Sequence, residues 1–154
     1  MRQNNAPVQS PSLAATGGKE LSIQSFQGAP LVVYFYPRDN TPGCTKEGQA
    51  FRDLYEKFET LGCAIVGVSR DSLKAHENFR AKHDFPFDLI ADPDEELCRQ
   101  FDVIKEKNMY GKKVIGIERS TFLLDSAGRI VREWRKVKVP GHAEEVLEAV
   151  RELG

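Results

Sequence analysis

The strongest constraint on the fold is one stretch, residues 31–47, in which a strand, a loop and a helix follow one another. Its first six residues, LVVYFY, are apolar and rich in β-branched and aromatic side chains, which is typical of a buried strand. Loop-forming residues come next: Pro37, Asn40, Pro42 and Gly43. Beyond them, apolar side chains recur at the three- and four-residue spacing of a helix: Phe51, Leu54, Tyr55, Phe58 and Leu61.

Cys44 therefore falls where the strand has ended and the helix begins. The first turn of a helix has unpaired N–H groups and the positive end of the helix dipole, and both favour a thiolate over a thiol. Because the thiolate is the nucleophile, Cys44 is a candidate reactive cysteine. Thr41 offers a hydroxyl near the sulfur, and Pro37 stiffens the loop. The alternative is an inert cysteine packed at a helix start, but the polar, proline-rich loop argues against burial.

Length and charge limit the possible classes of protein. The chain has 154 residues, of which 40% are hydrophobic and 29% charged, as expected for one globular domain. A net charge of -1 without a long basic run argues against binding to nucleic acid or an anionic membrane. No apolar run approaches the length of a membrane span, and residues 1–7 lack the apolar core of a signal peptide.

The three cysteines form no Cys-x-x-Cys pair, so the sequence suggests neither a disulfide scaffold nor a zinc site. A reducing, cytoplasmic compartment fits this cysteine content best. Three histidines, His76, His83 and His142, share no metal-ligand spacing and are expected to be solvated surface residues.

The domain prediction is a loose, polar N-terminal arm over residues 1–11, followed by a single domain over residues 12–154. The first part of that domain contains the turn signal TGGK at residues 16–19, which predicts a hairpin of two short strands. Further strands are expected at residues 63–69, 87–91, 120–125 and 130–135. Further helices are expected at residues 72–83, from about 93 to 101, and after 142.

This order contains a strand–helix–strand crossover, a late hairpin and a closing helix. It predicts an α/β fold with a mixed central sheet and helices on both faces. A thioredoxin-like fold is compatible with that order, and the order alone leaves a flavodoxin-like sheet open as an alternative.

A family resemblance narrows this choice. Pro37, Thr41 and Cys44 match the Pro-x-x-x-Thr-x-x-Cys signature of peroxiredoxins, and the full string YFYPRDNTPGCTKE resembles their bacterioferritin-comigratory, or Q-type, branch. Four more strings agree in order and spacing with that branch: VGVSRD, FDV, NMYG and GIERSTF. The resemblance spans residues 13–150 and implies a thioredoxin-like fold and a thiol peroxidase without metal, haem or flavin. It also implies that residues 103–114 form a loop on the active-site side.

A thiol peroxidase would give roles to five residues, of which that of Arg119 is implied by the resemblance. The Cys44 thiolate would attack hydrogen peroxide or an organic hydroperoxide and become a sulfenic acid. Thr41 and the N–H groups of the helix start would hold the peroxide, while Pro37 would shield the sulfur from water. Arg119 would face the sulfur, although by its pattern alone it is an ordinary surface arginine. Glu47 would orient Arg119, or else be a surface acid matched to the helix dipole.

The means of reducing the sulfenic acid is less constrained. The two positions where Q-type peroxiredoxins usually keep a resolving cysteine are Gln49 and the cysteine-free stretch around Arg80. Cys63 and Cys98 are both expected in the core. A one-cysteine mechanism with thioredoxin, glutaredoxin or glutathione as reductant is therefore favoured, with Cys98 as resolving residue the alternative.

Two rival functions remain at the level of the sequence. A thiol–disulfide oxidoreductase ranks low because it normally uses a Cys-x-x-Cys pair. A non-enzymatic binding or chaperone module with an incidental cysteine is the other. The resemblance favours the peroxidase, and it favours a monomer.

Overall fold

The computed structural model of the chain describes residues 6–153. Its centre is a seven-stranded sheet with the spatial order β2-β1-β5-β4-β3-β8-β9. The strands of this sheet are β1 (Leu13–Ala15), β2 (Lys19–Leu21), β3 (Leu31–Phe35), β4 (Ala64–Ser69), β5 (Asp88–Ala91), β8 (Ser120–Leu124) and β9 (Ile130–Trp134).

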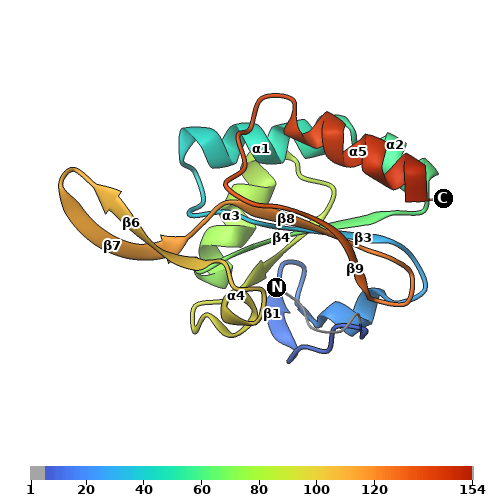
Figure 1. The fold of residues 1–154 in the computed structure, drawn as a ribbon, viewed down its shortest axis with the longest axis horizontal. Helices are drawn as coiled ribbons and strands as arrows, with labels where there is room; N and C mark the ends of the chain where they lie inside the picture. Colours follow the sequence, from blue (N-terminus) through green and yellow to red (C-terminus); the bar gives the residue numbers. More distant parts are fainter. Residues whose placement is uncertain (1–5, 154) are drawn as a thin grey trace.

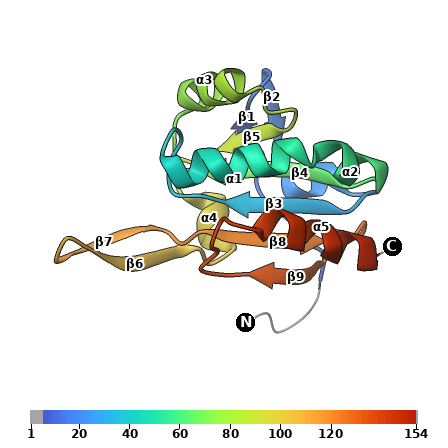
Figure 2. The ribbon, with the colours of Figure 1, turned by 90° about the horizontal axis from the view of Figure 1, so that it is seen from above.

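Helices cover both faces of the sheet (Figures 1 and 2). One face carries four of them: α1 (Pro42–Asp53), α2 (Tyr55–Thr60), α3 (Leu73–His83) and α5 (His142–Leu153). The other face carries α4 (Glu96–Gln100) and the short 3-10 helix η1 (Ile23–Phe26). The expected α/β architecture with helices on both faces is confirmed.

The sheet is mixed, as predicted. β3 runs parallel to β4, and β4 runs parallel to β5. On its other side β3 pairs antiparallel with β8, which pairs antiparallel with β9. Two antiparallel strands at this edge are incompatible with the all-parallel order of a flavodoxin-like sheet.

The apolar run of β3 is explained by its central place in the sheet. Successive side chains of a strand point to opposite faces. Accordingly, Val32 and Tyr34 pack in the core under α1, α2, α3 and α5, and Val33 and Phe35 pack in the core against α4 and η1. Because both faces are covered, every residue of β3 is buried and the strand shows no polar alternation.

The helix expected after Cys44 is divided in two. α1 ends at Asp53 and α2 begins at Tyr55, with Leu54 between them at φ -100° and ψ 2°. This backbone conformation lies outside the helical region, although the N–H of Leu54 still donates to the carbonyl oxygen of Ala50 at 3.3 Å. The apolar spacing continues across the break, which is why the sequence pattern does not reveal it.

The expectation of a loop over residues 103–114 is wrong. These residues form most of a hairpin of β6 (Ile104–Met109) and β7 (Lys112–Ile117), which projects from the body of the protein (Figure 1). Its two-residue turn, Tyr110 and Gly111, has positive φ values of 52° and 80°. Such a turn matches the twist of the two strands, but its usual signal is Asn or Asp before the glycine.

The predicted loose arm over residues 1–11 is partly corrected. Val8 is buried, and its N–H donates to the carbonyl oxygen of Gly128 at 2.8 Å. The hydroxyl of Ser10 accepts a hydrogen bond from the N–H of Ile23 at 2.8 Å. Residues 1–5 of the arm lie outside the described residues.

Two of the three histidines contradict the expectation of solvated side chains. His76 is fully buried and His142 is 5% exposed, whereas His83 is partly exposed.

Within residues 6–153, no helix is long and apolar enough to span a membrane. The same residues contain no group of three or more histidine, cysteine or acidic side chains arranged to hold a metal ion.

Candidate active site

Cys44 is the third residue of α1, at the end of the loop that leaves β3. Pro42 is the first residue of the helix, where its missing N–H costs nothing because this group would have no partner. Thr41 precedes the helix, and its hydroxyl donates to the carbonyl oxygen of Arg38 at 2.9 Å. Cys44 itself is only 2% exposed, so the expectation that the polar loop leaves it unburied is wrong.

Arg119 reaches Cys44 from a distant part of the chain because of the strand register. Ser120, the first residue of β8, pairs with Phe35, the last residue of β3. Arg119 is therefore held beside the end of β3, where the loop to α1 begins. Its Nη2 atom donates to Cys44 Sγ at 3.4 Å. A Cβ at Gly43 would lie 3.1 Å from Nη2, so a larger residue here would displace the guanidinium by a few tenths of an ångström.

Glu47 lies one helical turn after Cys44 and binds the same arginine. Arg119 Nη1 donates to Glu47 Oε1 at 2.6 Å, and the Glu47 side chain is 1% exposed. Burial raises the pKa of Glu47 to about 7, although the positive charge and hydrogen bond of Arg119 oppose this shift. Burial would lower the pKa of Arg119, but Glu47 and Cys44 raise it, so the guanidinium stays charged. One cation is thus shared by two groups that can be anions.

Glu47→Gln is expected to remove a pH-dependent loss of stability. The pKa of Glu47 is raised from 4.5 to about 7 on folding, so between these values the folded chain holds a proton that the unfolded chain has lost. The free energy of unfolding of the wild type should therefore fall as pH rises through this window, on the order of 3 kcal/mol in total. Glutamine does not titrate and should not show this fall.

Urea unfolding of both proteins at pH 4.5 and pH 8 measures this effect. The stability of Glu47→Gln relative to the wild type should shift in favour of the variant at pH 8. An equal difference at both pH values would contradict the raised pKa.

Lys107 is a second cation near the site, which the sequence did not reveal. Its ammonium donates to the carbonyl oxygen of Ile117, next to the loop that carries Arg119. Burial lowers the pKa of Lys107, and the positive charges of Arg119 and Arg70 lower it further. The pattern of lysines in this segment is that of ordinary solvated charge, because only the hairpin turns one of them inward.

The other two cysteines are free and buried, as expected. Burial raises the pKa of Cys63 to about 12 and raises that of Cys98 as well. Cys63 precedes Ala64, which pairs with Leu31 at the start of β3, so the whole length of that strand, roughly 16 Å, separates it from the end that leads to Cys44. Cys98 packs in the core on the opposite face of the sheet from Cys44.

The structure therefore brings together three of the five predicted residues by direct contact: Cys44, Glu47 and Arg119. Pro37 and Thr41 lie on the loop just before α1, both partly exposed. The arrangement can stabilise negative charge on sulfur and supply fixed hydrogen-bond donors beside it.

Comparisons with known proteins agree with this geometry. Residues 5–133 match the AhpC/TSA family. Peroxiredoxin Bcp of Xanthomonas campestris is 58% identical over 139 residues, which cover 90% of this chain and 87% of the relative. Peroxiredoxin Bcp of Bacillus subtilis is 46% identical over 136 residues, covering 88% and 87%.

Solved structures are similar as well. A mutant of peroxiredoxin Q from Xanthomonas campestris superposes with a TM-score of 0.91 at 52% identity, covering 98% of this chain and all of the other. This match confirms the thioredoxin-like fold expected from the resemblance. The chain therefore belongs to the AhpC/TSA family, as a peroxiredoxin of the Bcp or Q type, and is a thiol peroxidase.

Proposed function

We propose that Cys44 is the residue that reduces the peroxide. The observation that carries this proposal is the contact of 3.4 Å between Arg119 Nη2 and Cys44 Sγ at the start of α1. A guanidinium and a helix start both favour the thiolate. Neither of the other cysteines has such surroundings, since burial raises the pKa of both.

The proposed reaction begins with attack of the Cys44 thiolate on the near oxygen of the peroxide. A sulfur–oxygen bond forms, the oxygen–oxygen bond breaks, and the leaving oxygen takes up a proton to become water or an alcohol. Arg119 and the N–H groups of the helix start stabilise the charge on that oxygen, and Thr41 joins them when its hydroxyl turns from the Arg38 carbonyl oxygen to the peroxide. Glu47 holds Arg119 in place, and Pro37 limits the access of water to the sulfur.

Hydrogen peroxide and organic hydroperoxides are the proposed substrates. Solved structures of the Xanthomonas campestris bacterioferritin comigratory protein, 53% identical with a TM-score of 0.89, address the alkyl peroxide reduction activity of that protein. That similarity extends over 96% of this chain and supports an organic substrate here.

The proposed reductant is an external thiol: thioredoxin, glutaredoxin or glutathione. It would attack the Cys44 sulfenic acid, release water and form a mixed disulfide, and a second thiol would free Cys44. The positions of Cys63 and Cys98 support this one-cysteine route, because a disulfide requires two α-carbons within about 7 Å. Cys98 as resolving residue would require α4 to leave its core.

Mass spectrometry after one equivalent of hydrogen peroxide tests this route. The expected product carries one added oxygen on Cys44, while Cys63 and Cys98 remain alkylatable after unfolding. Loss of two hydrogens with a crosslinked Cys44–Cys98 peptide would instead establish the two-cysteine mechanism. A Cys63→Ser/Cys98→Ser double variant, which keeps Cys44 alone, should still turn over with a small thiol.

The cellular context belongs to the same proposal. The protein is proposed to be a monomer, as the family resemblance suggests. It is proposed to lie in the cytoplasm, because its three cysteines are all free. Residues 12–154 are proposed to form one domain, because one sheet contributes to both cores. Sedimentation of the reduced protein would test the monomer.

A further inference from the structure

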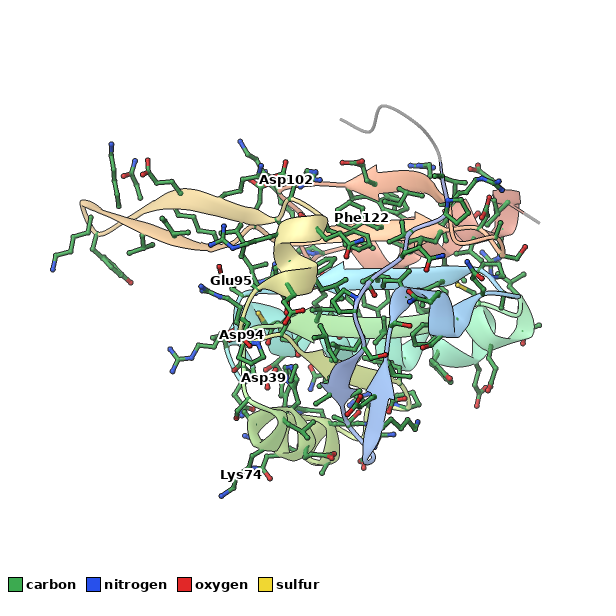
Figure 3. All side chains as sticks on the ribbon, turned by 90° about the horizontal axis from the view of Figure 1, so that it is seen from below. Asp39, Lys74, Asp94, Glu95, Asp102 and Phe122 are labelled. Carbon is green, nitrogen blue, oxygen red and sulfur yellow. The ribbon has the colours of Figure 1, made fainter. Side chains whose placement is uncertain are left out.

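A buried hydrogen-bonded chain of three side chains holds the loop that joins β3 to α1. The Tyr36 hydroxyl donates to Asp39 Oδ1 at 2.7 Å. The other oxygen of this carboxylate, Oδ2, lies 2.7 Å from His76 Nδ1, and His76 Nε2 donates to the carbonyl oxygen of Ile90 at 2.9 Å. Tyr36, Asp39 and His76 are 1%, 6% and 0% exposed. Figure 3 shows Asp39 between α3 and the end of the sheet.

These hydrogen bonds link three elements to one loop residue, Asp39. Tyr36 directly follows β3, His76 lies on α3, and Ile90 lies in β5. The backbone of the loop is held as well, because the N–H of Asp39 donates to Asp71 Oδ2 at 3.2 Å. Asp71 is itself fixed by the hydroxyl of Ser69 at 2.7 Å.

Both ring nitrogens of His76 are hydrogen-bonded. A carbonyl oxygen only accepts, so Nε2 carries a hydrogen, and Nδ1 shares a second hydrogen with Asp39 Oδ2. Burial, together with the Asp39 carboxylate, raises the pKa of Tyr36, so its hydroxyl keeps the hydrogen that it donates.

The position of Asp39 connects these hydrogen-bonded side chains to the surroundings of Cys44. Asn40, the next residue, has a positive φ of 62° and turns the backbone sharply into Thr41 and the start of α1. Fixing Asp39 therefore fixes where Thr41 and the first helical N–H groups lie relative to the sulfur. Because Cys44 is 2% exposed, a thiol as large as glutathione reaches its sulfenic acid only after this loop or the first turn of α1 moves.

We propose that His76 is a positioning residue of the peroxidase, which acts through Asp39 to hold the 37–41 loop closed over Cys44. The closed loop reacts with peroxide, and release of the His76–Asp39 contact opens it to larger reagents. This inference rests on the proposed role of Cys44. It gives His76 opposite effects on two reactions of the same sulfur, which loss of a catalytic group would not produce.

His76→Ala is expected to slow oxidation of Cys44 by hydrogen peroxide roughly tenfold to a hundredfold, the scale of leaving one buried hydrogen-bond partner, Asp39 Oδ2, unpaired. Alkylation of Cys44 by iodoacetamide in the folded protein should become about tenfold faster, because the variant favours the open loop. Both rate constants are measured without denaturant by mass spectrometry of the Cys44 peptide. Circular dichroism checks that each variant is folded.

Three further variants separate positioning from damage. Asp39→Ala should reproduce both changes, and the double variant with His76→Ala should add little to either one. Asp39→Asn should stay within about threefold of the wild type, because its amide can donate to a neutral His76 and accept from Tyr36. Ser72→Ala removes the N-cap of α3, whose hydroxyl accepts from Ala75 N at 3.1 Å, and is the matched control for a weakened helix.

The proposal is overturned if His76→Ala slows both reactions together, if it changes neither, or if Ser72→Ala gives the same pair of changes. Additive effects of His76→Ala and Asp39→Ala would also overturn it. Failure of the proposed function looks different, because the wild-type protein itself would then show no oxidation of Cys44 by peroxide.

Discussion

Cys44→Ser protein is expected to lose peroxide turnover, by roughly 10⁴-fold or more, as enzymes do when their nucleophile is removed. A serine hydroxyl at this position would remain protonated, so Arg119 would have no anion to stabilise at the sulfur position. The fold should survive, since the exchanged atom makes a single hydrogen bond, to Arg119. The measurement is consumption of hydrogen peroxide with dithiothreitol as reductant.

Cys63→Ala is the matched control for this result. Cys63 is also a buried cysteine of the same core, but it lies beyond the far end of β3. This variant should keep its turnover at 25 °C even if its stability falls. Turnover retained by Cys44→Ser would remove Cys44 from the reaction, and absence of turnover in the wild type would favour a binding or chaperone function.

Arg119→Ala should have the second largest effect, and it should affect both rate and stability. The peroxide step should slow roughly ten- to a thousandfold, the cost of removing one donor from a site of developing charge. The variant also leaves the buried Glu47 carboxylate without its cation. At pH 8 this should lower the free energy of unfolding on the order of 3 kcal/mol. The loss is smaller if Glu47 takes up a proton, because the buried side chain is then neutral.

A double variant separates the two effects of Arg119. Arg119→Ala/Glu47→Gln has no buried carboxylate to leave unpaired, so it should regain most of the lost stability. Its peroxide reaction should remain slow, because the donor to Cys44 is still missing. Urea unfolding and stopped-flow oxidation at pH 8 measure the two quantities. A double variant with the wild-type rate would exclude Arg119 from the chemistry.

The sequence was informative where one local pattern determines one structure. The six apolar residues at 31–36 predicted the central strand, and the loop residues after them predicted a helix start at Cys44; both are confirmed. Arg119 was found only through the resemblance, because it reaches Cys44 through the pairing of β8 with β3. A contact across 75 residues leaves no periodicity in the sequence around Arg119 that would reveal it.

Burial of polar groups was the main failure of prediction. Cys44 and His76 were both expected to contact solvent, yet 2% and none of their surface is exposed. Each is buried by residues distant in sequence, so its neighbours along the chain gave no warning. One signal was available for His76, which lies three residues before the buried Phe79 and so on the inner side of α3. The hairpin of β6 and β7 was missed because Tyr110 replaces the usual Asn or Asp of its turn.

That hairpin carries a risk of its own. β6 and β7 pair only with each other among the described residues, so each presents an unpaired outer edge, and Ile115 of β7 is 63% exposed. A bare edge of this kind can add a strand from another molecule, which is how fibrillar aggregates grow. The outside of this hairpin, however, carries three lysines, Lys105, Lys112 and Lys113, whereas Lys107 is turned inward. Two such hairpins brought edge to edge would place these like charges together, and their repulsion opposes aggregation. Acetylation removes the positive charge of lysine and would therefore weaken this protection.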